Sequence, residues 1–257
     1  MITLLTDFGY KDNFVGVVKG VILGINPRVH VVDLCHEVEP QDIMGAAFAL
    51  KTAYRYFPKD TIHLVIIDPG VGSGRLPILV KTKDYYFIGP DNGVLSLALE
   101  DQEIEGIVYL DNYEFHLRPV SNTFHARDIF APVAVHLSKG ISYQLFGKGL
   151  KDYKKIKLPK PKIKPSLISG EIIYIDRFGN LFTNISQDIK DKIKKPKIKI
   201  KDKLIRGLKS SYAQVKPKTL LAIWGSSGFL EIALNFGSAK ENLGAKIGEK
   251  VEIEINT

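Results

Sequence analysis

The first part of the chain alternates short, continuous apolar runs with longer stretches in which apolar residues recur at helical spacing. Residues 1–7, 29–34 and 61–67 are the apolar runs. Between them, residues 15–22 place valine and isoleucine on one helical face, and residues 43–56 are rich in alanine. Strands buried on both faces lose the alternation of polar and apolar positions, as these runs do. The order strand, helix, strand, helix, strand predicts an α/β domain with a mostly parallel central sheet.

The pattern changes after residue 150. Residues 151–168 are rich in lysine and proline, and because proline interrupts helices we interpret this stretch as an extended linker. Beyond it, short strand-like runs are separated by glycine and asparagine turns, which predicts a small all-β domain, either a barrel or a sandwich. The sequence therefore predicts an α/β domain over residues 1–150, the linker, and the β domain over residues 169–257.

The positive charge of the chain lies in its second part. Residues 1–150 contain 13 Lys and Arg against 17 Asp and Glu, a net of −4, and residues 151–257 contain 23 against 11, a net of +12, giving +8 in total. The excess consists mainly of lysines alternating with isoleucine or proline, as in residues 197–201, a pattern typical of the solvated face of a half-buried strand. Aromatic residues and arginine are scarce there, so we expect no nucleic-acid partner.

Other features limit where the protein acts. No apolar run reaches the roughly 18 residues that a membrane-spanning helix needs, so we expect no membrane partner. The amino terminus does not resemble a signal peptide. Cys35 is the one cysteine, so neither an internal disulfide nor a cysteine metal site is possible. These features together predict a soluble, cytoplasmic protein of ordinary globular composition.

Three loops at the ends of predicted strands contain acidic residues. Asp7 is followed closely by Asp12, Asp42 lies near residues 35–37, and Asp68 opens the glycine-rich loop 68–75. In α/β sheets, ligands bind beyond the carboxyl ends of the strands. The loop 68–75 lacks the Lys-Ser/Thr ending of a P-loop, and a tight turn that needs glycine at positive φ is an equally good interpretation.

Two further motifs contain residues that could act in chemistry. His125 precedes an apolar helix predicted over residues 129–137, where it is either a group that titrates near neutral pH or an ordinary surface residue next to a helix cap. Residues 175–180 lie in the second domain, and Gly179-Asn180 is typical of a hairpin turn.

Considered together, the motifs match one family. In chain order they are Leu5-Thr6-Asp7-Phe8-Gly9, Val32-Asp33-Leu34-Cys35-His36, Asp68-Pro69-Gly70-Val71-Gly72, Gly89-Pro90-Asp91-Asn92-Gly93, Thr123-Phe124-His125-Ala126-Arg127-Asp128 and Asp176-Arg177-Phe178-Gly179-Asn180. With these six motifs the chain resembles the S-adenosyl-L-methionine hydrolases (SAM hydroxide adenosyltransferases), which are relatives of fluorinase and chlorinase. The resemblance extends over essentially the whole length.

This resemblance implies a reaction and an assembly. The reaction is attack of water on the 5′ carbon of S-adenosyl-L-methionine, giving adenosine and L-methionine without a metal or another cofactor. The assembly is a homotrimer with each site between one subunit's N-terminal domain and its neighbour's C-terminal domain. The family's catalytic Asp, Arg and His fall here on Asp68, Arg75 and His125. The halogenases have neither an acid at the first position nor a histidine at the third, so the chain resembles the hydrolase branch.

The resemblance also implies a set of substrate-binding residues. Asp7 matches the residue that accepts hydrogen bonds from both ribose hydroxyls, which suits the two oxygens of a carboxylate. The others, with the part of the substrate that each is expected to contact, are Asp12 and Asp176 (methionine ammonium), Phe178 and Tyr212 (adenosine), Asn180 and Phe236 (adenine), and Ser227 (carboxylate). Two alternatives stay open: a halide-dependent adenosyl transfer, and a non-catalytic sensor that binds adenosine or S-adenosylmethionine.

Overall fold

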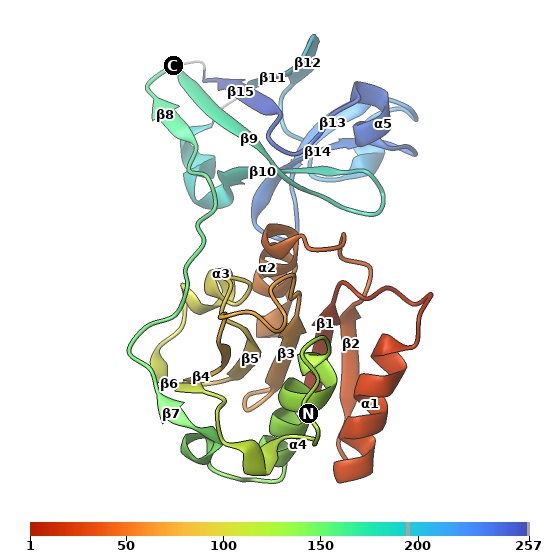
Figure 1. The fold of residues 1–257 in the computed structure, drawn as a ribbon. Coiled ribbons are helices and arrows are strands. Elements are labelled where there is room, and N and C mark those ends of the chain that lie inside the picture. The colour runs from red at the N-terminus through yellow and green to blue at the C-terminus, as the bar shows by residue number, and fades with distance from the viewer. Residues whose placement is uncertain (194–195, 256–257) are drawn as a thin grey trace. The chain divides into compact units, whose positions relative to one another are not determined.

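The computed structural model describes residues 1–193 and 196–255, which divide into two compact units, Met1–Lys157 and Leu158–Thr257 (Figure 1). The lysine- and proline-rich segment predicted as a linker is shared between them. Its beginning is tied to the first unit, because the Lys154 amide donates to Asp91 Oδ1 at 2.7 Å. Its later part forms strand β8 (Lys162–Lys164), which pairs with the second unit's sheet.

The first unit is built on a seven-stranded sheet with the strand order β2-β1-β3-β5-β4-β6-β7. Five of these strands run in one direction, while β4 and β7 run in the other, which confirms the predicted mostly parallel sheet. The strands are β1 (Ile2–Thr6), β2 (Val31–Cys35), β3 (Ile62–Ile66), β4 (Pro77–Thr82), β5 (Tyr86–Pro90), β6 (Ile104–Tyr109) and β7 (Lys148–Gly149).

Helices cover both faces of this sheet. The α-helices are α1 (Phe14–Ile25), α2 (Ile43–Ala53), α3 (Ser96–Leu99) and α4 (Ala131–Ser138). Short 3₁₀ turns are η1 (Tyr54–Tyr56), η2 (Tyr113–Phe115) and η4 (Tyr143–Phe146), and η3 (Ala126–Phe130) is a π-helical turn that runs into α4.

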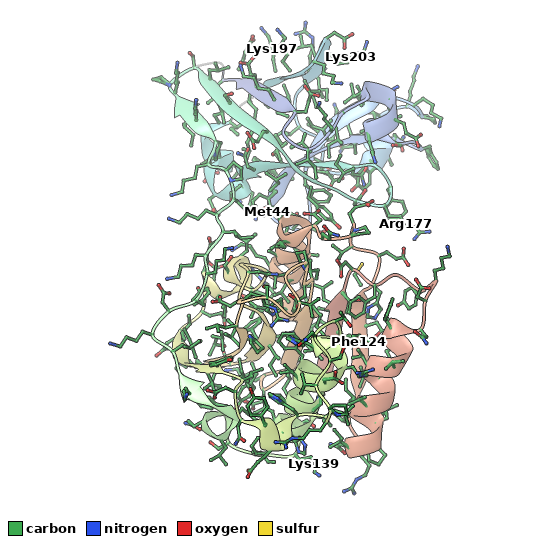
Figure 2. The ribbon with its side chains drawn as sticks, viewed as in Figure 1. Met44, Phe124, Lys139, Arg177, Lys197 and Lys203 are labelled. Atoms are coloured by element: carbon green, nitrogen blue, oxygen red, sulfur yellow. The ribbon has the colours of Figure 1, made fainter. Side chains whose placement is uncertain are left out.

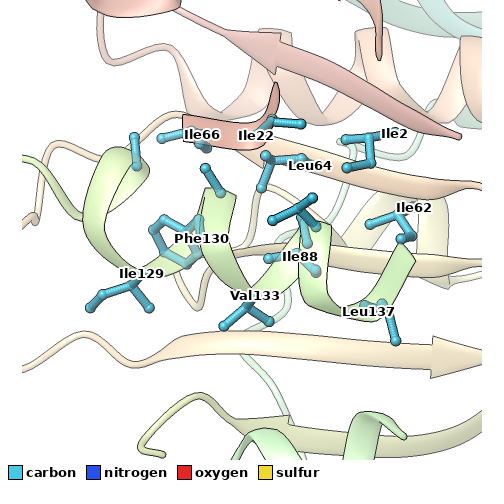
Figure 3. Close-up of a cluster of buried hydrophobic side chains, with 14 of the residues drawn as sticks. Ile2, Ile22, Ile62, Leu64, Ile66, Ile88, Ile129, Phe130, Val133 and Leu137 are labelled. Atoms are coloured by element: carbon cyan, nitrogen blue, oxygen red, sulfur yellow. The ribbon is translucent and has the colours of Figure 1, made fainter. Parts of the chain in front are cut away.

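The apolar runs of the sequence are explained by this covering on two sides. Leu4 and Leu64 belong to a core cluster that includes side chains of α1 and α4 (Figure 3). The next residue in each strand, Leu5 or Val65, belongs to the cluster that includes α2 and α3. Because successive side chains of a strand point to opposite faces, both faces of β1 and β3 need apolar residues, and the sequence shows no alternation there.

The second unit is an antiparallel sheet in the order β12-β11-β15-β9-β10-β14-β13, with β8 added beside β9. Its strands after β8 are β9 (Leu167–Ile175), β10 (Leu181–Ser186), β11 (Lys197–Ile200), β12 (Lys203–Arg206), β13 (Leu220–Trp224), β14 (Phe229–Leu234) and β15 (Lys250–Glu254). Its helical turns are η5 (Gln187–Lys192), η6 (Tyr212–Gln214) and α5 (Ala239–Leu243). Lys209, just after β12, pairs with Ile223 of β13, so the sheet nearly closes into a barrel.

The lysine alternation has the predicted explanation. Ile198 and Ile200 of β11 are fully buried in the core of the second unit, while Lys199 between them is exposed. Lys197, which is labelled in Figure 2, lies opposite Glu254 of β15 in the sheet, and its Nζ is 3.6 Å from Glu254 Oε2. The basic residues of this strand therefore form a solvated face that is partly neutralised by glutamates of the neighbouring strand.

A search for bilayer-spanning segments over residues 1–193 and 196–255 finds no helix with the length and apolar character to cross a membrane.

Candidate active site

Two of the predicted acids meet at one end of the parallel sheet. Asp7 directly follows β1, and Asp68 comes shortly after β3, the strand that pairs with β1 in parallel. Both acids, together with His125, line a cavity of about 400 Å³. This position, beyond the carboxyl ends of parallel strands, is where α/β sheets bind ligands.

Asp68 and Arg75 form a bidentate ion pair inside this site. Arg75 Nε donates to Asp68 Oδ1 at 2.8 Å, and Arg75 Nη2 donates to Oδ2. Both side chains are more than nine-tenths buried, and the guanidinium also lies over the ring of Phe130, 5.3 Å from its centroid. Parallel N–H···O bonds of this kind fix geometry as well as charge, so the carboxylate of Asp68 has one defined orientation.

His125 is held by the same arginine. Arg75 Nη2 lies 2.8 Å from His125 Nδ1, and because a guanidinium has only donors, Nδ1 must accept. The imidazole is therefore neutral, with its proton on Nε2. Burial, and then the charge of Arg75, hold the pKa of His125 below its usual value, which favours the same neutral form. In this arrangement Nε2–H is a hydrogen-bond donor.

Local backbone structure brings His125 to Arg75. His125 immediately precedes η3, and π-helical turns within helices are frequent at functional sites. The preceding loop packs directly on the glycine-rich loop: a Cβ on Gly72, which has φ +73°, would lie 2.3 Å from the carbonyl oxygen of Asn122. Only glycine permits this approach of two backbones, and the approach sets the spacing between Arg75 and His125.

Asp7 is oriented by a neighbouring loop. Its Oδ2 accepts a hydrogen bond of 2.8 Å from the amide of Gln41, whose backbone is in the left-handed region at φ +67°. A carboxylate has about four lone-pair sites, so most of the acceptor capacity of Asp7 remains for a ligand.

Three phenyl rings form an apolar wall of the cavity. Phe8, Phe14 and Phe124 pack on one another with centroid separations of 5.7, 6.1 and 5.4 Å. Phe124 is labelled in Figure 2. Phe8 and Phe124 were not predicted as site residues, although both lie inside motifs that carried the resemblance. Such a wall lowers the local dielectric constant beside Asp68 and His125.

Asp12 lies elsewhere in the first unit. It lines a separate surface hollow of about 480 Å³ at the start of α1, together with Tyr10 and Lys19. It does not line the cavity that contains Asp7 and Asp68.

In the second unit, Asp176 organises the turn between β9 and β10. Its Oδ1 accepts from the amides of Phe178 and Asn180 at 2.9 and 2.8 Å, and its Oδ2 accepts from the Asn180 side chain at 2.9 Å. The predicted hairpin is confirmed, with Gly179 at φ +80° in the bend. The turn leaves the ring of Phe178 76% exposed, so a large aromatic surface is presented to solvent.

Tyr212 is joined to an acid that the sequence analysis missed. Its hydroxyl donates to Glu231 Oε1 at 2.7 Å, and Glu231 is 2% exposed. Burial, with a contribution from nearby Asp176, raises the pKa of Glu231, and burial with Glu231 raises the pKa of Tyr212. The available signal was a lone acid inside the apolar run 229–234.

The last two predicted residues have different surroundings. Ser227 Oγ is buried and has no hydrogen-bond partner within residues 1–193 and 196–255. Phe236 is 79% exposed with φ +54°, and its carbonyl accepts from Lys218 Nζ at 2.7 Å. The contacts described connect neither residue to Asp176. As for metals, the described part of the chain contains no group of three or more His, Cys, Asp or Glu side chains that could hold an ion.

Comparison with known proteins decides the family. Residues 2–147 match the sequence model of the SAM hydroxide adenosyltransferase N-terminal domain, and residues 170–252 match that of the C-terminal domain. The chain belongs to the SAM hydroxide adenosyltransferase family. The resemblance inferred from the six motifs is thereby confirmed.

Individual relatives agree with this assignment. The (R)-S-adenosyl-L-methionine hydrolase of Methanocaldococcus jannaschii is 35% identical, over 98% of this chain and 95% of the relative. The crystal structure of an uncharacterized conserved protein from Thermotoga maritima, 39% identical, matches with a TM-score of 0.93 over 98% of this chain and 99% of that one. A fluorinase from Actinoplanes sp. is 28% identical, over 72% of this chain and 71% of its own length. The relative named as a hydrolase thus matches nearly the whole chain, and the relative named as a fluorinase matches less of it.

Proposed function

We propose that this protein hydrolyses S-adenosyl-L-methionine to adenosine and L-methionine. The observation that carries the proposal is the Asp68–Arg75–His125 cluster on the wall of a cavity that also contains Asp7. The family relatives named as hydrolases support it.

The chemistry needs little beyond an oriented nucleophile. Water attacks the 5′ carbon, the new C–O bond forms as the C–S bond breaks, and the bonding pair leaves on sulfur as the neutral thioether of methionine. The thioether that departs from a sulfonium is already a good leaving group, so we propose no metal or other cofactor. Holding water and substrate together can lower the barrier by roughly 7–11 kcal/mol. Because charge disappears in the transition state, the apolar phenyl wall also favours reaction over bulk water.

The three polar residues then have separate roles. His125 donates from Nε2 to the oxygen of the water, since its Nδ1 is occupied by Arg75. Asp68 accepts the proton that the water loses, because it is the acceptor of the cluster. Arg75 holds both partners in place, with Nε 2.8 Å from Asp68 Oδ1 and Nη2 2.8 Å from His125 Nδ1. General-base assistance of this kind is typically worth about 10²–10⁴-fold.

We further propose that the site is composed of two chains of a homotrimer. In this proposal Asp7 of one subunit receives the ribose hydroxyls, and the neighbouring subunit supplies the residues carried over by resemblance in the second unit. The exposed ring of Phe178 and the ordered Asn180 amide support this role, since both are features of a surface built to meet a planar, polar base.

Isotope labelling tests the reaction. In oxygen-18 water the purified protein should release adenosine labelled at the 5′ oxygen, because the nucleophile comes from solvent. Unlabelled adenosine, or 5′-methylthioadenosine as the main product, would contradict the mechanism. Binding without any product would indicate a sensor, and a chlorinated nucleoside formed in added chloride would indicate a halide-dependent transferase. Both sulfonium epimers should be tested; we expect faster turnover of the (R) epimer, for which the relatives are named.

Subunit mixing tests the assembly. Asp68→Ala and Asn180→Ala proteins should each be inactive, whereas trimers exchanged between them should regain part of the wild-type activity, because some composite sites contain neither change. A mixture of Asp68→Ala with Arg75→Ala serves as the matched control, since both changes fall in the same half of the site and no intact site can form. Confirmed exchange without rescue would place each site within one chain.

A further inference from the structure

Asp7 is held on both sides by one buried histidine that the mechanism does not use. The residue before it, Thr6, has its Oγ1 2.8 Å from His36 Nδ1. The amide of Gly9, two residues after it, donates to the carbonyl oxygen of His36 at 2.7 Å. His36 follows β2 directly, and its side chain is completely buried. The loop that carries Asp7 is thus attached to the end of the neighbouring strand at two points.

The hydrogen bonds around Thr6 continue through the imidazole. The Phe8 amide donates to Thr6 Oγ1 at 3.2 Å, and Thr6 Oγ1 lies 2.8 Å from His36 Nδ1. His36 Nε2 lies 3.0 Å from Asp33 Oδ1, and the neutral tautomer with its proton on Nε2, facing this carboxylate, has Nδ1 as the acceptor for the Thr6 hydroxyl. Asp33 Oδ2 in turn accepts from Lys19 Nζ at 2.6 Å.

The two sides of the imidazole are not equivalent. On one side Nδ1 lies 2.8 Å from Thr6 Oγ1, and on the other Nε2 lies 3.0 Å from Asp33 Oδ1. The ring of Tyr10 covers the imidazole edge-on, with centroids 5.2 Å apart. The contact with Thr6 is the one that connects the His36 side chain to the Asp7 loop.

We infer that His36 is a positioning residue that orients the carboxylate of Asp7 toward the ribose of the substrate. A carboxylate that receives two hydroxyls must be held within about 0.5 Å of the productive geometry. The Gln41 amide fixes one oxygen of Asp7, and His36 fixes the backbone on each side of it. This inference rests on the proposed function, in which Asp7 binds the ribose hydroxyls.

Matched substitutions separate the two sides of the imidazole. His36→Asn places an amide oxygen where Nδ1 lies and keeps the acceptor for Thr6, while His36→Gln reaches toward Asp33 and loses that acceptor. Thr6→Val removes the hydroxyl with little change of shape, and Thr6→Ser retains it. Each protein is assayed with S-adenosyl-L-methionine and with its 2′-deoxyribosyl analogue, and the ratio of the two kcat/KM values is the readout.

We define the ribose preference as kcat/KM for S-adenosyl-L-methionine divided by kcat/KM for its 2′-deoxyribosyl analogue. This ratio should fall about fivefold or more in Thr6→Val and His36→Gln, because a displaced Asp7 carboxylate makes a weaker charged hydrogen bond to the ribose. It should stay within about twofold of wild type in Thr6→Ser and His36→Asn. If His36 and Thr6 acted only in folding, kcat/KM would fall equally for both substrates and the ratio would be unchanged in all four variants. That result would overturn the inference. Should the His36 variants fail to fold, the Thr6 pair alone gives the answer.

Asp7→Ala tests this inference separately from the proposal on which it rests, that Asp7 binds the ribose hydroxyls. If Asp7→Ala removes the ribose preference and Thr6→Val does not reduce it, the inference alone is overturned. If Asp7→Ala leaves the preference unchanged, the assignment of Asp7 to ribose fails and the inference fails with it. Adding Thr6→Val to Asp7→Ala should cause no further change in the ratio. Calorimetric affinities for adenosine and 2′-deoxyadenosine give the same comparison without requiring turnover.

Discussion

Asp68 in the first unit and Glu231 in the second are both buried acids, but their charges are balanced differently. Arg75 donates to both oxygens of Asp68, so that carboxylate has a full cationic partner. The hydrogen-bond partner described for Glu231 is the neutral hydroxyl of Tyr212, and the neighbouring charge that affects it is another acid, Asp176. Within residues 1–193 and 196–255, no ion pair involves Glu231 or Asp176.

This difference shows two ways in which a buried acid is accommodated. A buried charge is costly unless it is paired, and Asp68 meets that requirement within its own chain. Its orientation is therefore set before any ligand arrives. Glu231 lacks such a partner and its pKa is raised, so its charge state depends on what lies next to it. The first unit thus holds its buried acid in a fixed geometry, whereas the charge state of the buried acid in the second unit responds to its surroundings.

Removing the charge of Asp68 should have the largest effect. Asp68→Asn keeps the size of the side chain but loses the proton acceptor and the ion pair, so kcat for S-adenosyl-L-methionine hydrolysis should fall on the order of 10²-fold with little change in KM. Steady-state adenosine production measures both constants. Asp84→Asn, a change at a surface aspartate paired with Lys59, is the matched control and should leave both constants unchanged. A large rise in KM with kcat preserved would instead assign Asp68 to attraction of the sulfonium.

Much of this first-unit site could be predicted from the sequence. Continuous apolar runs fixed where β1 and β3 lie, and parallel strands bring the residues that follow them together, so Asp7 and Asp68 were expected at one edge. The motifs then identified Arg75 and His125 through resemblance. The contact between Arg75 and His125 could not be predicted, because it depends on two loops that are far apart in sequence and meet at Gly72.

The second unit was less predictable at the level of single residues. Its strands and its hairpin turn follow from local patterns, and Asp176 and Asn180 follow from one motif. Glu231 belongs to no motif, and its importance arises from its burial next to Tyr212, a contact between residues of η6 and β14. Asp12 shows the reverse case: its closeness to Asp7 in the sequence does not bring it into the same cavity.

Replacing His125 should have an effect on kcat of intermediate size, and it should change how kcat depends on pH. Arg75 keeps the histidine neutral, so kcat should be constant from pH 8 down to the lowered pKa and should fall below it, because a proton on Nδ1 would face the guanidinium. His125→Gln supplies an amide donor that does not titrate, so it should lose less than about tenfold in kcat at pH 8 and lack this acidic decrease. Profiles of kcat from pH 5 to 8 provide the measurement. The control is His30→Gln, at an exposed position, which should keep the wild-type pH profile of kcat. If His125→Gln shows the same decrease in kcat at acidic pH as the wild type, the prediction is wrong.

The smallest effect concerns stability in the second unit. Because the pKa of Glu231 is raised in the folded state, the folded chain binds more protons than the unfolded chain above the usual pKa, and stability from this group is lost as pH rises through the raised value. Glu231→Gln should therefore flatten the decrease in unfolding free energy between pH 4.5 and 8, by about 1 kcal/mol.

Urea unfolding followed by the fluorescence of Trp224, the single tryptophan, reports on this unit directly. Glu254→Gln, an exposed change on β15, should leave the pH dependence close to that of wild type. A Glu231→Gln protein with the wild-type slope would show that the unfolded and folded states bind protons equally at this position.

The contact between Gly72 and the Asn122 carbonyl also bears on how the chemistry of this site can be altered by design. Two loops that touch through their backbones leave no space for an inserted residue or for a side chain at the point of contact. Remodelling by changes in loop length would separate Arg75 from His125 and dismantle the cluster. A new nucleophile is therefore best sought by exchanging side chains at positions 68, 75 and 125 on an unchanged backbone, with Gly72 kept as the fixed reference for any such library.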